Sequence, residues 1–245
     1  MISLNEAHKT FINNLKEQGK SHSTLIAYSK DIEQLIEHLI EKGLVLVSEI
    51  DTTHLVSFMQ NLADKKYTAK SISRKTNATK TFCKFLHDNS FIIQNVSDQI
   101  KHPKVDNKEP RILSKVEYRA LRDAARNDLR SYALIEMLLQ TGITISEVSE
   151  IEMDHLQLSG SEGNLFIPKK NNKEARSIPL NKSVVQIIQK YIDQERPNVK
   201  GSTGLFITKS GNNLLVRNIR STIDRYFKLA GIENAKVNDL RHTFI

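Results

Sequence analysis

A chain of 245 residues with 39% hydrophobic and 26% charged residues has the composition of a globular protein, which excludes the disordered class. Its formal net charge of +8 points to a polyanionic partner such as nucleic acid. The single cysteine, Cys83, excludes an internal disulfide framework, and no apolar run reaches the roughly 18 residues that span a bilayer. Because the N-terminus also lacks a signal-peptide core, we expect a cytoplasmic protein that does not enter membranes.

Four amphipathic helices are predicted over the first hundred residues. The first covers about residues 3–19 and the second about residues 21–43, and each stops at a glycine suited to end a helix. In the second, apolar side chains recur at steps of three and four residues, which is the clearest helical period in the chain. The third begins after Asp51, a favourable N-cap residue, and the fourth covers about residues 69–88.

The predicted fourth helix has an unusual charge pattern. Its polar face holds four spaced cations and no acidic residue before Asp88, whereas a solvated helix face usually mixes both signs. A further lysine, Lys75, lies at the flank of this face. Two interpretations stay open: a solvated face, or a face that contacts the phosphates of a nucleic acid. For the second, the candidate DNA-binding residues are Lys70, Arg74, Lys75, Lys80 and Lys84.

The helical period stops in "QIKHPKVDNKEPRILSK", where two prolines stand among alternating charges, as in an interdomain linker. We expect a helical domain over residues 1–100, a linker over 101–112 and a second domain over 113–245. The second domain is predicted to be mainly helical with a small sheet, an α+β arrangement. Its segment "GNLFIPKKNNKEARSIPL" alternates as strand, turn and strand, and "GLFITKSG" suggests another short strand.

Few residues of the chain are suited to chemistry. The eight histidines are scattered, and no CxxC, HExxH or glycine-rich phosphate loop occurs, so we expect no metal and no cofactor. The remaining candidates are Lys170, at the predicted hairpin turn, and Arg241, which we place at a helix start. A cation there opposes the helix dipole and suggests an anionic ligand. The alternatives are a solvent-exposed lysine and an arginine paired with Asp239 or Glu233.

Five segments form an ordered series along the chain: "SISRKTNATKTFCKFL", "PRILSKVEYRAL", "LLQTGITISEVSEI", "KKNNKEARSIPL" and "NDLRHTF". Together they resemble the tyrosine recombinases, also called phage integrases, and most closely the Xer-like branch. The resemblance covers nearly everything from about residue 5 to the end. It implies a four-helix, SAM-like core-binding domain and a helical catalytic domain with a small antiparallel sheet, which close around duplex DNA from opposite sides.

The resemblance also implies a chemistry. In that family a tyrosine attacks the scissile phosphate and forms a 3′-phosphotyrosyl linkage without a metal or other cofactor. Two arginines hold the nonbridging oxygens, a hairpin lysine protonates the leaving 5′-oxygen, and histidines assist proton transfer. By resemblance, Lys170 matches the lysine and Arg241 the second arginine. The first arginine's position in "TGITISE" holds Thr144, which with Glu147 forms a capping box, and the histidine's position in "NDLRH" holds Asn238.

The family's tyrosine nucleophile falls a few tens of residues after Arg241, and all six tyrosines of this sequence precede it. We therefore expect a C-terminally truncated chain. Intact members act as tetramers on paired sites, so we expect a monomer here, or a weak dimer on DNA.

Two functions stay open for this chain. The first is a site-specific recombinase or integrase whose present chain binds duplex DNA without cleaving it. The second is a non-catalytic DNA-binding protein that occupies or regulates recombination sites, which Thr144 favours because truncation does not explain an internal substitution. A helical transcription regulator would leave the hairpin and "NDLRHTF" unexplained.

Overall fold

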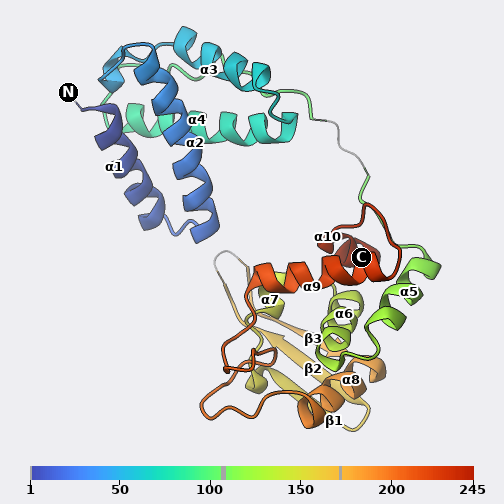
Figure 1. The fold of residues 1–245 in the computed structure, drawn as a ribbon. Helices are drawn as coiled ribbons and strands as arrows, with labels where there is room; N and C mark the ends of the chain where they lie inside the picture. Colours follow the sequence, from blue (N-terminus) through green and yellow to red (C-terminus); the bar gives the residue numbers. More distant parts are fainter. Residues whose placement is uncertain (1, 106–108, 171–172) are drawn as a thin grey trace. The chain divides into compact units, whose positions relative to one another are not determined.

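The computed structural model describes residues 2–105, 109–170 and 173–245, and it divides into two compact units, Met1–Asn107 and Lys108–Ile245. Within these ranges the chain is mainly helical with one small antiparallel sheet, as the sequence predicts (Figure 1). The described ranges contain no helix of the length and apolarity that crossing a membrane requires. The predicted linker, 101–112, falls partly on residues 106–108, which lie outside the described residues, so its boundaries stay a prediction.

The first unit is a bundle of helices built around one apolar core. Phe11 and Phe82 meet edge to face at its centre, with 5.2 Å between ring centroids. Cys83 lies beside them, and burial raises the pKa of its thiol to about 12, so it is a core residue. The predicted N-cap is confirmed, because the Asp51 carboxylate accepts the His54 backbone N–H at 2.9 Å. The elements are α1 (Leu4–Glu17), α2 (His22–Glu41), the 3-10 turn η1 (Val47–Glu49), α3 (Thr52–Asp64) and α4 (Ala69–Asp88).

A buried ion pair links α2 to α4. Asp31, 1% exposed, accepts Lys75 Nζ at 2.7 Å and Arg74 Nη1 at 2.5 Å, and Lys75 also donates to Gln34 Oε1 at 2.5 Å. Lys75 is only 3% exposed, so its predicted placement at the flank of the polar face is wrong. The physical reason is that a helix turns by about 100° per residue, which carries Lys75 inward from the polar stripe that contains Arg74. The ion pair with Asp31 compensates the free-energy cost of removing the Lys75 ammonium from water.

The second unit contains the sheet, whose strands run in the order β1-β2-β3 with antiparallel neighbours. Leu165 in the central strand pairs with Leu156 on one side and Ile178 on the other. The predicted strand-turn-strand is thus confirmed as β2 and β3, while β1 was not predicted. The elements are α5 (Lys115–Ala125), α6 (Leu129–Thr141), α7 (Ile145–Val148), the 3-10 turn η2 (Met153–His155), β1 (Leu156–Ser159), β2 (Glu162–Ile167), β3 (Arg176–Leu180), α8 (Lys182–Gln194), α9 (Val216–Leu229) and α10 (Val237–Phe244).

The strand suggested for "GLFITKSG" is wrong. This segment forms the isolated bridges Glu152–Gly204 and Ile207–Asn213 and no regular strand. Its apolar residues are nevertheless buried, because they enter the core of the second unit from a loop. The short apolar run flanked by glycines therefore correctly indicated that these side chains are buried, but it did not indicate a strand.

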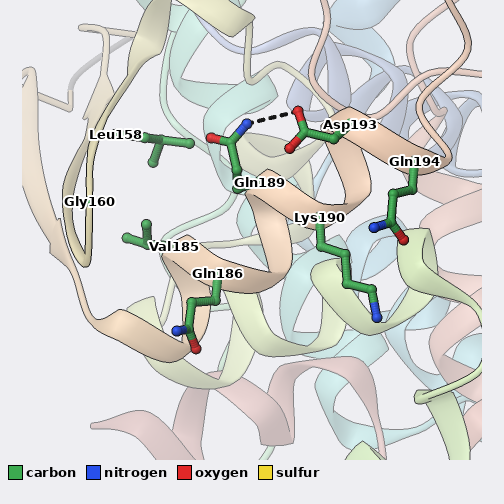
Figure 2. Close-up of a pocket in the computed structure, with 8 residues that line it drawn as sticks. All are labelled: Leu158, Gly160, Val185, Gln186, Gln189, Lys190, Asp193 and Gln194. Carbon is green, nitrogen blue, oxygen red and sulfur yellow. Dashed lines mark hydrogen bonds between the residues drawn. The ribbon is translucent and has the colours of Figure 1, made fainter.

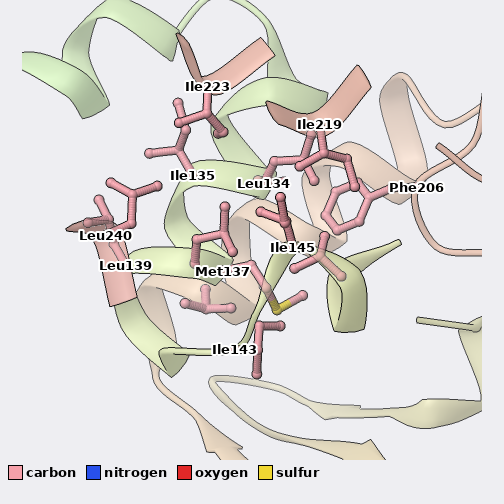
Figure 3. Close-up of a cluster of buried hydrophobic side chains, with 14 of the residues drawn as sticks. Leu134, Ile135, Met137, Leu139, Ile143, Ile145, Phe206, Ile219, Ile223 and Leu240 are labelled. Atoms are coloured by element: carbon pink, nitrogen blue, oxygen red, sulfur yellow. The ribbon is translucent and has the colours of Figure 1, made fainter. Parts of the chain in front are cut away.

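Helix α6 lies in the middle of the second unit's core, with apolar side chains around most of its circumference. Figure 3 shows its side chains among those of α9, α10, the segment after α6 and the loop that contains Phe206: Leu134, Ile135, Met137, Leu139, Ile143, Ile145, Phe206, Ile219, Ile223 and Leu240. Gly142 ends α6 with φ 61°, and a Cβ at this position would overlap the ring of Phe244. Both the left-handed backbone and the close approach require glycine here.

Replacing Lys75 with alanine is expected to lower the free energy of unfolding by about 3 kcal/mol, because Asp31 stays buried and loses a cation. Lys84→Ala, at an exposed position of the same helix, is the control and should change it by less than about 0.5 kcal/mol. Urea unfolding followed by circular dichroism measures both values. Small, equal losses would contradict the buried pair.

Candidate nucleic-acid interface

The polar face of α4 keeps most of its predicted cations at the surface. One stripe of the helix is formed by residues at steps of four, three, four and three: Lys70, Arg74, Asn77, Thr81 and Lys84. Lys80 lies beside this stripe and is half-buried. Within the described part of the chain, no carboxylate pairs with Lys70, Lys80 or Lys84, whereas Arg74 is held by Asp31. The stripe is therefore a face with uncompensated positive charge.

In the second unit, the candidate catalytic residues gather along the segment Gly142–Glu150, which leads from α6 through α7. Arg241 comes from α10 and donates a hydrogen bond to the Gly142 carbonyl. Lys170 comes from the β2–β3 hairpin and forms an ion pair with Glu150. The fold thus brings these two cations to the two ends of one short segment. Their binding to a single phosphate stays a prediction.

Arg241 lies further along its helix than the sequence suggested. Lys236 is the N-cap of α10, so Arg241 is the fifth helical residue, and the dipole argument does not apply beyond the first turn. Neither Asp239 nor Glu233, the two alternative partners considered for Arg241, binds the Arg241 guanidinium in the structure. The Asp239 carboxylate accepts the Lys236 backbone N–H at 2.7 Å, and the Glu233 carbonyl accepts Arg111. The Gly142 carbonyl, freed where α6 ends, is the group that holds Arg241.

Thr144 is the N-cap of α7, as predicted. Its Oγ1 accepts the Glu147 backbone N–H at 3.2 Å, and Glu147 Oε2 accepts the Thr144 N–H at 2.8 Å and the hydroxyl at 3.0 Å. This reciprocal capping box satisfies donors at the start of the helix that would otherwise lack partners. Thr144, which we expect at the position of the family's first arginine, therefore stabilises α7 and brings no charge.

Glu147 also binds two cations of the hairpin. Arg176 Nη2 donates to Oε1 at 2.9 Å, and Lys173 Nζ lies 3.8 Å from the same oxygen. Burial acts to raise the pKa of Glu147, but hydrogen bonds from Thr144 and Arg176 outweigh it and hold that pKa below its ordinary value. The ionised carboxylate, whose side chain is 13% exposed, therefore fastens the hairpin to α7.

Sequence reasoning missed Arg176. It alternates with Ile178 and Leu180 on the inward face of β3, where an unpaired cation would be costly. An arginine in register with two inward apolar residues is a signal that a carboxylate partner lies nearby. That partner is Glu147, which follows Gly142 by five residues.

The polar side chains that neighbour Arg241 on α10, Asn238 and His242, make few contacts with other residues. Asn238 is exposed on the first turn of α10. His242 Nδ1 lies 3.7 Å from Asp239 Oδ1, a separation too long for a hydrogen bond. The tyrosines of the second unit contact other groups: Tyr118 binds Gln140, Tyr132 binds Arg122, Tyr191 stacks on Phe206, and Tyr226 donates to Asp128.

Helix α9 carries further exposed cations that the sequence analysis did not select: Arg217, Arg220, Arg225 and Lys228. Arg225 lies 3.6 Å from the Asp128 carboxylate. Arg217 and Arg220, near the helix start, form no ion pair with any described residue. The sequence feature that could have identified these two arginines is the absence of acidic residues from the first two turns of this helix.

Two other features lie apart from these residues. A pocket of about 340 Å³ between α8 and the β1–β2 turn is lined mainly by amide and apolar side chains and holds neither Lys170 nor Arg241 (Figure 2). Possible ligand atoms of Glu152, Asp154 and His155 lie within 4.8 Å of one another. However, His155 Nδ1 already accepts the Glu152 backbone N–H at 3.2 Å, so neither feature provides a phosphate site.

Sequence comparison identifies the family. The sequence model of the phage integrase family matches residues 111–245, and that of the phage integrase N-terminal SAM-like domain matches residues 9–89. The tyrosine recombinase XerC of Natranaerobius thermophilus is 30% identical over 240 residues, which cover 93% of this chain and 79% of the relative. XerC of Roseiflexus castenholzii is 25% identical over 252 residues, with 98% and 79% covered. The chain belongs to the phage integrase family of tyrosine recombinases, and the predicted Xer-like resemblance is confirmed.

Solved structures share the fold. A λ integrase (75–356) dimer bound to a COC′ core site has a TM-score of 0.76 at 17% identity, covering 99% of this chain and 88% of that one. The Tn1549 transposon integrase in complex with transposon right end DNA has a TM-score of 0.77 at 16% identity, covering 99% and 85%. At these identities the likeness concerns the fold.

Replacing Glu147 with glutamine is expected to cost about 1–3 kcal/mol of stability at neutral pH, because charge-assisted hydrogen bonds are lost. The folded pKa of Glu147 lies below its ordinary value of 4.5, so this contribution is present above the unfolded pKa and disappears as pH falls through the folded pKa. Thermal unfolding of both proteins across this range measures the difference. The exposed Glu174→Gln is the control, and a pH-independent difference for Glu147→Gln would contradict the interpretation.

Proposed function

We propose that this chain binds duplex DNA as part of a site-specific recombination system. The observation that carries the proposal is the convergence of Lys170 and Arg241 on the segment Gly142–Glu150 in a member of the phage integrase family. Two further findings support it. Among the described residues no acid pairs with Lys70, Lys80 or Lys84 of α4, and the relatives are named tyrosine recombinases, with solved neighbours bound to DNA.

In this proposal residues 113–245 form the catalytic domain, residues 1–100 the core-binding domain, and residues 101–112 the linker. Lys170 and Arg241 hold a backbone phosphate, and the α4 stripe contacts other phosphates through Lys70, Arg74, Lys80 and Lys84. Lys75 has a structural role, since Asp31 holds it in the core. The Lys170–Glu150 pair does not prevent phosphate binding, because both side chains are more than half exposed and such pairs contribute little.

Thr144 and Asn238 support binding without cleavage. Loss of one donor that stabilises transition-state charge typically costs about 10²–10³ in rate, and Thr144 uses its side chain as a helix cap. An asparagine can donate a hydrogen bond but cannot transfer a proton as histidine does. These two positions favour a non-catalytic protein that occupies or regulates recombination sites as the second candidate function. A cytoplasmic location, and a monomer or weak DNA-dependent dimer, stay predictions.

Replacing Lys70, Lys80 and Lys84 together with alanine should weaken binding to a labelled duplex and reduce the slope of log affinity against log salt by up to about three, because each phosphate contact releases counterions. Fluorescence anisotropy over a salt series gives both quantities. The control is a triple alanine variant of Lys9, Lys16 and Lys20, exposed lysines outside α4. Equal losses in the two variants would show an effect of net charge and would contradict the assignment of the α4 face.

The 245-residue chain should form no covalent adduct with a pool of nicked suicide duplexes of mixed sequence, because its six tyrosines all precede Arg241, whereas the family's nucleophile follows it, and Thr144 and Asn238 slow the chemistry further. Denaturing gel electrophoresis of the labelled DNA after incubation detects any phosphotyrosyl product. A retarded band that survives denaturation and disappears after protease treatment would refute the inactive state.

A further inference from the structure

The Arg176 guanidinium lies beside the position that lacks the family's first arginine. The Glu147 carboxylate joins the two residues: one oxygen accepts the Thr144 hydroxyl at 3.0 Å, and the other accepts Arg176 Nη2 at 2.9 Å. The cation is therefore linked to the side chain of position 144 through a single carboxylate, although it comes from β3.

We propose that Arg176 binds a DNA phosphate in place of the arginine that position 144 lacks. The inference rests on the DNA-binding function proposed above, and it names a residue of that site which the family motifs do not mark. It makes Arg176 and Arg241 the two guanidinium groups of the phosphate site.

The first support is the hydrogen-bonding capacity of Arg176. A guanidinium has five N–H donors, and the described contacts use one of them, on Glu147. The side chain is 37% exposed, so donors remain available to an incoming ligand. A phosphate accepts two parallel N–H bonds from such a fork.

The second support is the position of the two guanidinium groups. Arg241 binds the carbonyl of Gly142, and Arg176 binds Glu147, whose other oxygen is fixed to Thr144. The two cations are thus bound to residues of one short segment, Gly142–Glu147, in which Ile143 is buried. In this proposal a phosphate at the segment accepts N–H bonds from both guanidinium groups.

The third support is the charge balance around Glu147. Arg176 and Lys173 both lie on this carboxylate, so the group as a whole has an excess of positive charge. Glu147 orients Arg176 and neutralises one cation, as a carboxylate does when it holds an arginine for an anionic ligand. The family's own arginine at position 144 would instead project from the loop itself.

The test measures binding of the full chain to a labelled duplex of mixed sequence over a salt series. Arg176→Gln should weaken binding about 10- to 100-fold, as expected for a lost charge-assisted contact, and reduce the salt slope by about one. Arg126→Gln is the matched control, since Arg126 is an exposed arginine paired with Asp123 at 3.5 Å. It should change binding less than about twofold.

A rescue separates phosphate binding from a purely structural role. Thr144→Arg added to Arg176→Gln should restore most of the affinity, whereas Thr144→Arg alone should add less, because the site already contains a guanidinium. An arginine at position 144 could also pair with Glu147, so thermal unfolding of each variant is measured beside binding: a purely structural repair would restore stability without restoring the affinity and the salt slope. Absence of rescue, with both proteins folded by circular dichroism, would overturn the inference.

The remaining outcomes are also decisive. If the unaltered chain shows no salt-dependent binding, the proposed function fails; if it binds and Arg176→Gln matches Arg126→Gln, only this inference fails. If Arg176→Gln does not fold, Arg176→Lys keeps the ion pair with Glu147 and removes the fork. It should bind about tenfold more weakly, and affinity equal to that of the unaltered chain would overturn the inference.

Discussion

The carboxylate of Glu147 is the group on which the second unit's candidate site depends. It caps α7 through Thr144 and binds Arg176 and Lys173 of the hairpin, so it fixes a helix start and a strand start with one ionised side chain. Five residues earlier, Gly142 turns the chain in a conformation that an L side chain rarely adopts, which frees its carbonyl for Arg241. Three segments far apart in the sequence are thereby joined at a loop of a few residues.

Two largely buried carboxylates, Asp31 in the first unit and Glu147 in the second, have different purposes. In the first unit Lys75 and Asp31 neutralise each other inside the bundle, with almost no exposed surface, and they connect α2 to α4. In the second unit Glu147 is mostly buried, while its cations remain partly exposed. The first arrangement leaves nothing for a ligand, because both partners are consumed by the fold. The second leaves donors at the surface, because the carboxylate engages only part of each cation.

Sequence patterns predicted the helices well where one face is apolar, as in α2, and predicted the capping box at Thr144, where the spacing is local. They failed where a contact partner is distant in sequence. Lys75 looked like a surface lysine because its partner, Asp31, belongs to another helix. Arg176 was overlooked for the same reason, and Arg241 was placed one turn too early because nothing in "NDLRH" marks the N-cap at Lys236. Helix boundaries and charge partners are set by tertiary contacts, which periodicity does not contain.

Binding and catalysis make separable demands on such a site. Contacts to phosphates in the ground state need positive charge at suitable places, and α4, α9, Lys170, Arg176 and Arg241 offer it. Acceleration of strand cleavage needs interactions that strengthen only in the transition state, together with proton transfer. In the proposed function, Thr144 contributes to helix stability and Asn238 offers a neutral amide, so these two positions lack the second kind of interaction and leave the first unchanged. The proposed affinity for DNA would therefore depend little on these two positions, since it is distributed over many cations, whereas strand cleavage depends on a few groups.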